Sequence, residues 1–307
     1  MRYSRQEIFL GKKSQKILSK SKVAIVGLGA LGTVSAELLT RSGVNLTLID
    51  RDLIELTNLQ RQTLFSEKDI NKPKVLVAEK KLRRINSEIV IKSHFINLDF
   101  QNVNLLKSEV ILDCTDNLET RFLINEFSVK NRIPFIYASA IKNNGYVFNV
   151  LNKPCLKCIL KNSKTTETCE TTGVLNTITS MMASIQVNEA VKILTRNNPE
   201  KDLIYLNLEN NALAKIKVNP DKNCPVCNGN FEYLSGKKQQ VNNYCSTFIF
   251  KEKFDYDSVK LKLKKLGAGQ FQKAIIFNKL TIFPDSVIIK TSSEKEAKSL
   301  YSRYIGN

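Results

Sequence analysis

A short glycine-rich loop is the first segment of the sequence with the residue types and spacing for chemistry. Gly27, Gly29 and Gly32 form a G-x-G-x-x-G pattern directly after an apolar run at residues 23–26. Such a turn lets backbone N–H groups approach a nucleotide phosphate at the positive end of the following helix. Asp50 ends a second apolar run, where a carboxylate can accept ribose hydroxyls. These residues predict a Rossmann-type nucleotide site, and they do not by themselves fix the reaction.

Three polar segments downstream supply groups for phosphates and a metal ion. They are residues 58–62 (Asn-Leu-Gln-Arg-Gln), Lys74 after a proline, and residues 113–117 (Asp-Cys-Thr-Asp-Asn) after a buried apolar run. Arginine, lysine and Mg²⁺ stabilise the negative charge that builds up when a phosphorus atom is attacked. The sequence has no G-x-x-x-x-G-K-[ST] pattern, so ATP would have to be bound without a P-loop.

Together, these segments resemble the ThiF/MoeB/HesA family of adenylyltransferases, which are relatives of ubiquitin-activating enzymes. The resemblance extends over about residues 1–230, begins with Arg2-Tyr3-Ser4-Arg5-Gln6, and rests on the order of the motifs. It implies ATP-dependent adenylation of the C-terminal glycine of a small ubiquitin-like protein, with release of pyrophosphate. The partner would be a sulfur carrier of the molybdopterin-synthase or thiamine type that ends in Gly-Gly. A homodimer and a sulfurtransferase partner are also implied.

The resemblance further implies a role for each matching residue. Asp50 would hold the ribose, Asp116 would hold Mg²⁺, and Arg5 would reach the triphosphate from the partner subunit of a homodimer. The implied phosphate ligands are Asn58, Arg61 and Lys74. The full nucleotide-binding set is Gly27, Gly29, Gly32, Asp50, Asp52, Asn58, Arg61, Gln62, Lys74, Asp116 and Asn117. The catalytic set is Arg5, Arg61, Lys74, Asp116 and Cys169.

Four of the seven cysteines form two C-x-x-C pairs, Cys155 with Cys158 and Cys224 with Cys227. Paired thiolates at this spacing suit a closed tetrahedral zinc site, although the pairs are too far apart in sequence for a compact zinc ribbon. Two unconnected thiol pairs and a redox C-x-x-C are the alternatives. The family carries a zinc clamp at these places, so the resemblance favours structural zinc.

Cys169 stands in a polar run just before a predicted helix, which indicates an exposed thiol. Its position matches one where some family members form a thioester or persulfide with the carrier, while others stop at the adenylate. Neighbouring Glu167 and Glu170 disfavour a thiolate, whereas the helix N-terminus favours it. A catalytic thiol and an ordinary exposed thiol both remain open.

Apolar patterns along the chain predict the elements that must position these residues. Strands alternate with helices at about 30–42, 72–86 and 120–130, which indicates a doubly wound, mainly parallel sheet. Strands near 146–150, 203–208 and 213–218 are expected to add to it in antiparallel fashion, with a long helix at 174–195. We therefore expect an α/β Rossmann-like adenylyltransferase domain with a zinc clamp at 1–230, followed by a small α+β module at 231–307.

The balance of 47 Lys and Arg against 29 Asp and Glu gives a formal charge of +18. Most of the excess is scattered lysine, which favours a solvated basic surface over docking of acidic proteins. Nucleic acid is disfavoured because no known binding motif or basic and aromatic stripe is present. The apolar helix near 175–194 contains several polar and charged residues, so we expect no membrane span and a cytoplasmic protein.

Two other functions compete with adenylation. The glycine loop and Asp50 also suit an NAD-dependent oxidoreductase, but that function leaves Arg61, Lys74 and the cysteine pairs without a role. A non-catalytic basic scaffold is the second alternative. Hydrolases that use a histidine triad are disfavoured, because His94 is the only histidine and its strand position indicates a half-buried structural role.

Overall fold

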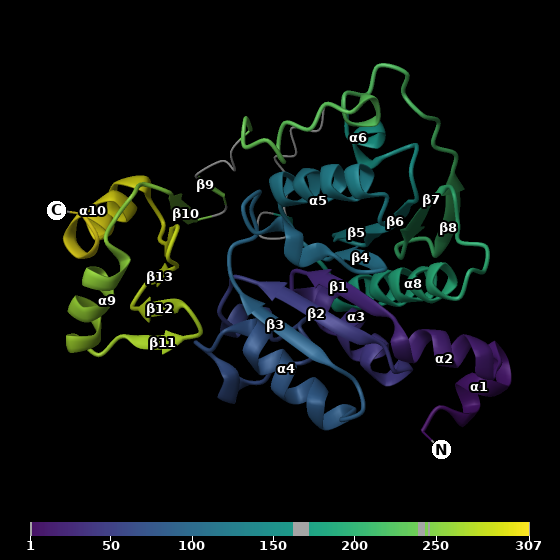
Figure 1. Cartoon of the computed structure of the whole chain (residues 1–307), viewed down its shortest axis with the longest axis horizontal. Coiled ribbons are helices and arrows are strands. Elements are labelled where there is room, and N and C mark those ends of the chain that lie inside the picture. The colour runs from purple at the N-terminus through teal and green to yellow at the C-terminus, as the bar shows by residue number, and fades with distance from the viewer. Residues whose placement is uncertain (1, 162–171, 239–242, 245, 307) are drawn as a thin grey trace. The chain divides into compact units, whose positions relative to one another are not determined.

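An eight-stranded sheet forms the centre of the larger of two units in this computed structural model (Figure 1). The structure describes residues 2–161, 172–238, 243–244 and 246–306. Contacts within the chain separate one unit, Met1–His94 with Leu98–Lys238, from a second, Phe95–Asn97 with Gln239–Asn307.

The sheet of the first unit has the strand order β3-β2-β1-β4-β5-β6-β7-β8. Its strands are β1 (Lys22–Val26), β2 (Asn45–Asp50), β3 (Ile91–Phe95), β4 (Val110–Asp113), β5 (Phe135–Ile141), β6 (Asn144–Val150), β7 (Leu203–Asn207) and β8 (Ala212–Ile216). Strand β1 pairs in parallel with β2 and β4, and β4 with β5, whereas β6, β7 and β8 are added in antiparallel fashion. The predicted Rossmann-like sheet with antiparallel additions is confirmed.

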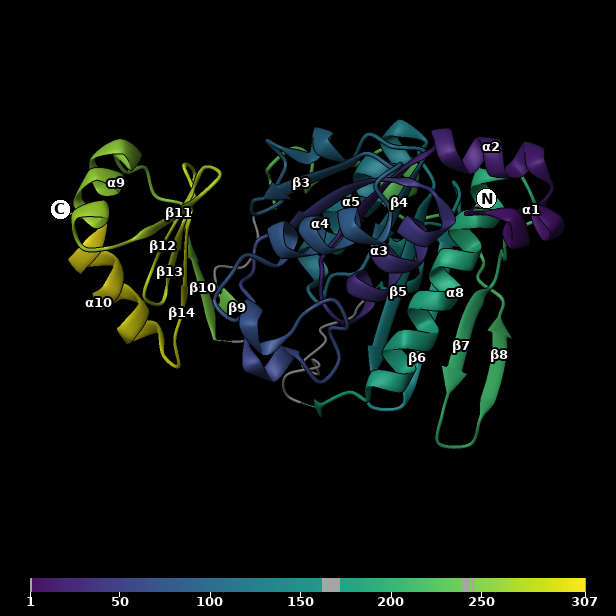
Figure 2. The same ribbon diagram turned by 90° about the horizontal axis from the view of Figure 1, so that it is seen from below.

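Helices cover both faces of this sheet. Helices α3 (Ala30–Ser42) and α8 (Asn176–Leu194) pack together on one face, and α5 (Leu118–Asn131) lies on the other (Figures 1 and 2). Helix α4 (Lys74–Ile85) packs beside α3. Helix α8 approaches β6 closely, because a Cβ at Gly145 would lie 2.3 Å from Met182 Cγ. A doubly wound sheet of this kind places its ligands where the helices change face.

Two N-terminal helices that the sequence analysis did not predict lie at the C-terminal end of α3. They are α1 (Ser4–Leu10) and α2 (Lys12–Lys20). Gln6 and Gln15 donate side-chain hydrogen bonds to the Ser42 carbonyl at 3.2 and 3.1 Å. A Cβ at Gly43 would lie 2.8 Å from the Tyr3 ring. The N-terminal segment is therefore fixed to the end of α3 that is distant from the glycine loop.

Short elements also lie within the described part of the first unit. They are the 3-10 turns η1 (Leu56–Asn58), η2 (Glu67–Asp69), η3 (Val103–Leu106) and η4 (Val226–Asn228), and the four-residue helix α6 (Leu156–Ile159).

The second unit contains a six-stranded antiparallel sheet of order β11-β12-β13-β14-β10-β9. Its elements are β9 (Asn243–Tyr244), β10 (Thr247–Phe250), α9 (Tyr256–Lys265), β11 (Gly269–Phe271), β12 (Ala274–Phe277), β13 (Leu280–Ile282), β14 (Val287–Lys290) and α10 (Glu294–Tyr304). The helices lie together on one side of the sheet (Figure 2). Leu263 of α9 and Ala297 of α10 share a core with strand residues such as Ile282 and Ile289. The unit is therefore an α+β layer with its own apolar core.

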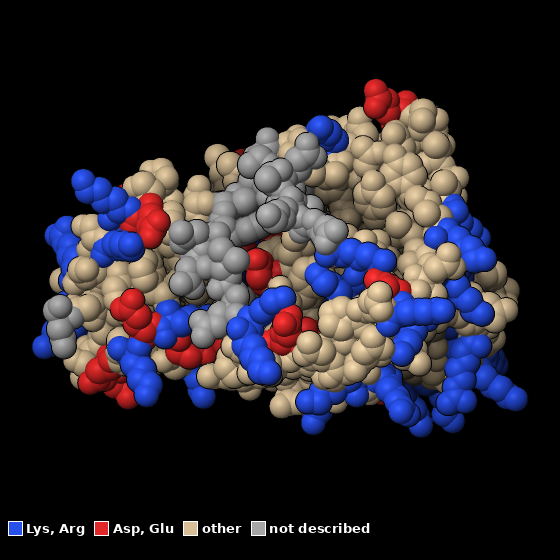
Figure 3. All heavy atoms as spheres, turned by 90° about the horizontal axis from the view of Figure 1, so that it is seen from above, with Lys and Arg blue, Asp and Glu red and all other residues tan. Residues whose placement is uncertain are grey.

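The surface carries many basic side chains. Lys and Arg are spread over the face shown in Figure 3, with Asp and Glu among them. This distribution fits the solvated basic surface that the composition predicts. Among the helices in the described part of the chain, none combines the length and apolar character needed to cross a bilayer.

Candidate nucleotide site and cysteine cluster

The loops after β1 and β4 meet at the point where the connecting helices change face. Strand β1 leads through the glycine loop into α3, and its neighbour β4 leads through residues 114–117 into α5. Ligands of doubly wound sheets bind beyond the carboxyl ends of the strands at such a switch point. The fold thus brings together two motifs that lie more than eighty residues apart in the sequence.

The three glycines of the loop serve different purposes. Gly27 has a φ of +88°, and a Cβ there would lie 2.7 Å from the Cys114 carbonyl oxygen. A Cβ at Gly32 would lie 1.9 Å from the Gly27 carbonyl oxygen. At Gly29, by contrast, a Cβ would meet only Gln62 Nε2, at 4.0 Å. Packing within the protein requires the first and third glycines, whereas the second borders space that a ligand can enter.

Asp50, at the end of β2, connects the glycine loop to the next segment. Its carboxylate accepts hydrogen bonds from the backbone N–H groups of Leu28 at 2.5 Å and Asp52 at 2.6 Å. Burial raises the pKa of Asp50, and the nearby Lys74 charge opposes that rise. Lys74 begins α4, and its Nζ lies 3.6 Å from Asp52 Oδ2. The structure therefore brings Asp50, Asp52 and Lys74 together beside the glycine loop.

The polar segment 58–62 forms a tight turn next to this loop. Asn58 is buried, and its Oδ1 accepts a hydrogen bond from the Glu55 N–H at 3.2 Å. The half-buried Arg61 donates to the Thr57 carbonyl at 2.9 Å, so its guanidinium is held by its own turn. Gln62 Oε1 is buried and has no hydrogen-bond partner among the described residues. Because buried acceptors are normally paired, this oxygen indicates that a donor from a ligand or water completes the site.

The loop after β4 carries Asp116 and Asn117. Asp116 is exposed. Asn117 caps α5, since its side-chain oxygen accepts the Thr120 N–H at 2.9 Å. Asn117 thus has a clear role in building the loop, separate from the nucleotide role that was predicted for it.

Arg121, which the sequence analysis did not single out, binds back onto this loop. Its Nε lies 3.3 Å from Oδ2 of the fully buried Asp113, and it donates a hydrogen bond to the Thr115 carbonyl. Its guanidinium carbon lies 5.0 Å from the ring centre of Tyr137. Burial raises the pKa of Asp113, and the Arg121 charge opposes that rise. An arginine one turn after the Asn117 cap was the available sequence signal.

Arg5 is the predicted site residue that the chain does not bring to its own nucleotide loop. It is exposed on α1, at the C-terminal end of α3. Helix α3 has 13 residues, which corresponds to a length of about 20 Å. Within one copy, Arg5 therefore lies about one helix length from the glycine loop.

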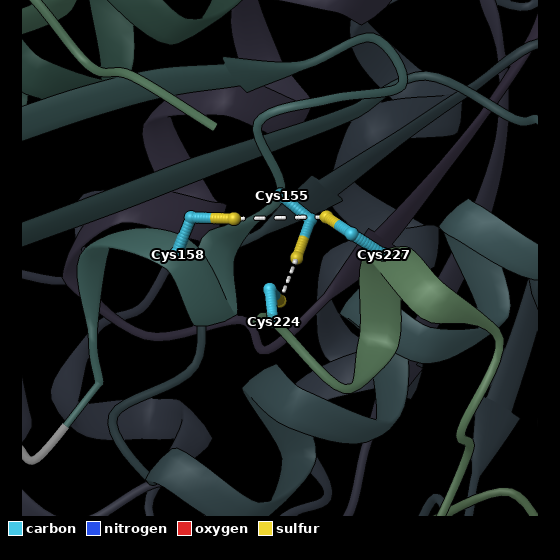
Figure 4. A group of neighbouring side chains, drawn as sticks. All are labelled: Cys155, Cys158, Cys224 and Cys227. Carbon is cyan, nitrogen blue, oxygen red and sulfur yellow. Dashed lines mark hydrogen bonds between the residues drawn. The ribbon is translucent and has the colours of Figure 1, made fainter. Parts of the chain in front are cut away.

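The four cysteines of the C-x-x-C pairs converge from two distant loops (Figure 4). Cys155 Sγ lies 3.6 Å from Cys224 Sγ, and Cys158 Sγ lies 3.6 Å from Cys227 Sγ. All four sulfur atoms lie within 4.8 Å of one another. A disulfide would need a separation near 2.05 Å, whereas tetrahedral zinc with Zn–S bonds of about 2.3 Å places its sulfurs about 3.8 Å apart. The cluster therefore has the dimensions of a four-thiolate zinc site.

Neighbouring groups hold the two halves of this cluster. Asn125 of α5 accepts the Leu156 N–H at 2.8 Å, next to Cys155. Lys161 pairs with Asp221 at 2.8 Å and joins the two loops at the surface. Burial raises the pKa of Cys227 to about 11, a shift that a bound dication would oppose. Cys169 lies outside the described residues.

Comparison with known proteins identifies the family. Residues 3–226 match the ThiF family. The chain belongs to the ThiF family. The resemblance inferred from the motifs is thus confirmed. The matched range of this ThiF-family chain contains the glycine loop, Asp50, the 58–62 turn, Lys74 and Asp116, and it extends into the second cysteine pair.

Two curated relatives and one solved structure illustrate what this ThiF-family chain is similar to. It is 33% identical to the sulfur carrier protein ThiS adenylyltransferase of Bacillus subtilis (strain 168), with 99% of each chain covered. It is 34% identical to the molybdopterin-synthase adenylyltransferase of Escherichia coli (strain K12), over 74% of this chain and 96% of that one. The crystal structure of E. coli MccB with ATP matches with a TM-score of 0.66 at 22% identity, over 75% of each chain. This last likeness concerns the fold.

Proposed function

We propose that this chain uses ATP to adenylate the C-terminal glycine of a small ubiquitin-like sulfur-carrier protein. The observation that carries the proposal is the 99% coverage of both chains in the match to a ThiS adenylyltransferase. The geometry adds independent support, because the glycine loop, Asp50, Lys74 and the Asp116 loop surround one switch point. A nucleotide would find a free acceptor in the buried Gln62 Oε1 and open space beside Gly29.

The reaction converts a poor acyl donor into a good one. A carboxylate oxygen of the carrier's terminal glycine attacks the α-phosphorus of ATP and forms an acyl phosphate bond. The bond between the α-phosphorus and the oxygen bridging to the β-phosphate breaks, and pyrophosphate leaves with that electron pair. Positioning and charge stabilisation supply most of the catalysis in such transfers.

The residues of the site can share this work. The carboxylate of Asp50 has lone pairs beyond those that accept the Leu28 and Asp52 N–H groups, so it can also accept ribose hydroxyls. Backbone N–H groups of the glycine loop would bind phosphate oxygens at the start of α3. Lys74, Arg61 and Asn58 would bind the phosphates, and Gln62 would contact the nucleotide beside them. A Mg²⁺ ion, held by Asp116, would neutralise charge on the departing pyrophosphate.

A homodimer would complete the site. We propose that Arg5 of one copy contacts the triphosphate bound by the other, because α1 lies about one helix length away from its own glycine loop. Exposed apolar side chains on the same helix, Ile8 at 77% and Phe9 at 87%, fit an interface between copies.

The cysteine cluster would hold zinc in a structural role. Four thiolates close a tetrahedral shell and leave no open position for substrate. The ion would tie the α6 region to the end of the adenylyltransferase domain, which we place at residues 1–230, ahead of the C-terminal module at 231–307.

Cys169 would serve a second step if the carrier is passed on as a thioester. Its thiolate would attack the acyl carbon of the adenylate, and AMP would leave with the electron pair of the cleaved bond. A Cys169→Ala variant, whose side chain can form neither a thioester nor an ester, is expected to form the adenylate but no covalent carrier adduct, as judged by non-reducing electrophoresis. An adduct that survives this substitution would exclude the role.

ATP–pyrophosphate exchange tests the main proposal. The purified chain, Mg²⁺ and labelled pyrophosphate are combined with candidate carriers that end in Gly-Gly, and each carrier is matched with a control lacking its final glycine. Exchange is expected with a cognate carrier and not with its truncated control. No exchange with any carrier, or tight binding of NAD in preference to ATP, would refute adenylation.

A further inference from the structure

We infer that Arg121 positions Asp116 for Mg²⁺ by clamping the loop between β4 and α5. The inference rests on the proposed function, because it assumes that Asp116 holds the metal ion. Arg121 reaches three separate elements: Asp113 at the end of β4, the Thr115 carbonyl in the loop, and the Tyr137 ring on β5. Its side chain is only 12% exposed, so these contacts lie mostly within the protein.

Asp113 provides the other half of the clamp. Its Oδ1 accepts hydrogen bonds from the Thr115 N–H at 2.8 Å and the Thr115 hydroxyl at 2.6 Å. Its Oδ2 faces Arg121 Nε at 3.3 Å. Thr115 is therefore held at its N–H and hydroxyl by Asp113 and at its carbonyl by Arg121. This leaves little freedom for the peptide bond that joins Thr115 to Asp116.

The opposite side of the same loop rests on the glycine loop. The Cys114 carbonyl and the Thr115 nitrogen lie so close to Gly27 that a Cβ there would meet them at 2.7 and 3.1 Å. Arg121 thus fixes Asp116 relative to the loop that would bind the phosphates. Asp50, on the opposite side of β1, is held by other hydrogen bonds. Loss of Arg121 should therefore disturb metal use more than nucleotide binding.

Arginine suits this task better than lysine. Its flat guanidinium can stack on the Tyr137 ring while its charge faces the Asp113 carboxylate and one N–H group donates to the Thr115 carbonyl. A lysine would keep the charge near Asp113 but would lose the stacking and the planar group that faces both partners. The two substitutions Arg121→Lys and Arg121→Met therefore separate the effect of charge from that of geometry.

Binding of ATP with and without Mg²⁺, measured by calorimetry in the absence of any carrier, tests the inference. In the wild-type chain, Mg²⁺ is expected to tighten ATP binding. In Arg121→Met the metal-free affinity should be unchanged and the gain from Mg²⁺ should be lost, with Arg121→Lys in between. Arg84→Met, the same change at an exposed arginine of α4, is the matched control.

Kinetics provide a second readout. A misplacement of about 1 Å can slow a reaction on the order of 10²-fold, so kcat of exchange in Arg121→Met is expected to fall to that extent. KM for the carrier should stay constant, and KM for ATP should rise by no more than the gain in affinity that Mg²⁺ gives the wild-type chain. The inference is wrong if folded Arg121 variants keep the full Mg²⁺ effect, or if they lose metal-free ATP binding. If no carrier supports exchange with the wild-type chain, the proposed function fails, but the binding experiment still decides the role of Arg121.

Discussion

The different surroundings of Gly29 and Gly32 lead to a prediction that separates ligand binding from folding. Gly32→Ala would place a Cβ 1.9 Å from the Gly27 carbonyl oxygen, whereas ordinary contact begins near 3.4 Å. Backbone would have to move, because a carbonyl oxygen cannot rotate away as a side chain can. Gly29→Ala would meet only the end of the Gln62 side chain, at 4.0 Å. The two substitutions add the same methyl group, three residues apart.

The expected sizes of the two effects follow from these distances. Overpacking costs about 1–3 kcal/mol, which lowers the melting temperature of a unit of this size by about 2–12 °C. Gly32→Ala should show this loss. Gly29→Ala should stay within about 1 kcal/mol of the wild type, since its Cβ occupies space that the protein leaves open. That Cβ would stand where phosphates approach, so the affinity for ATP should fall roughly 10- to 100-fold.

Thermal unfolding followed by circular dichroism, without nucleotide, measures the first effect, and calorimetric titration with ATP measures the second. The reasoning fails if Gly29→Ala is as unstable as Gly32→Ala, because the space beside Gly29 would then be filled by the protein. It also fails if Gly29→Ala binds ATP as well as the wild type does. Gly267→Ala in the second unit is a control for adding a methyl to a glycine with open surroundings and positive φ.

Three further predictions concern the cysteine cluster, the pH dependence of ATP binding, and the contact of Glu126 with residues 232–234. Cys158→Ser should reduce bound zinc from one ion per chain to almost none. It should also lower the melting temperature, because metal binding contributes to folding. A zinc content equal to that of the wild type, measured by elemental analysis, would show that Cys158 is not a zinc ligand. Lys74→Met should raise the pKa of Asp50 further, because it removes the positive charge that counteracts the effect of burial on that pKa. The loss of ATP binding at acid pH should therefore begin at a higher pH than in the wild type. If ATP affinity, titrated from acid to neutral pH, shows no such shift, Lys74 does not influence the ionisation of Asp50. Glu126 is buried and accepts the N–H groups of Glu232, Tyr233 and Leu234 at 3.1, 2.9 and 3.0 Å, and burial raises its pKa. Between its unfolded and its raised folded pKa the native state binds more protons than the unfolded state, so stability falls as pH rises through that window. Glu126→Gln should remove this part of the pH dependence in urea unfolding, and an identical pH profile in the two proteins would count against it.

The sequence predicted the large elements of the first unit well and its N-terminal helices not at all. Helix α3 begins and ends where the apolar pattern placed it, because a buried element needs a continuous apolar face. Helices α1 and α2 depend on side-chain contacts with the end of α3, such as Gln15 with the Ser42 carbonyl. Helix α1 buries none of its seven residues and α2 buries only Gln15 and Leu18, so neither has the long buried apolar face by which the other helices were predicted. Strands β9 and β11 have only two and three residues, too few for a periodic signal.

The candidate site was predictable in its residue types and less so in its geometry. The motifs pointed to the glycine loop, Asp50, Lys74 and Asp116. They did not show that Asp50 also binds the Leu28 N–H of the glycine loop. Arg121 was missed because its importance comes from Asp113 and Tyr137, which approach it only in the folded sheet. The C-x-x-C pairs indicated zinc, but only the fold could show that loops about seventy residues apart bring their sulfurs together.

The close contact of Gly27 with the Cys114 carbonyl has a consequence for how the site responds to its substrates. Two loops that touch through backbone atoms cannot open independently. The glycine loop and the loop after β4 are therefore preorganised before ATP binds. Little conformational entropy remains to be lost there, and free and nucleotide-bound forms should superimpose closely over both loops. A phosphate role for Arg61 would instead require movement in the 58–62 turn, because its guanidinium donates to the Thr57 carbonyl. Among the described residues, we therefore expect induced fit at this turn and not at the two loops that meet through their backbones.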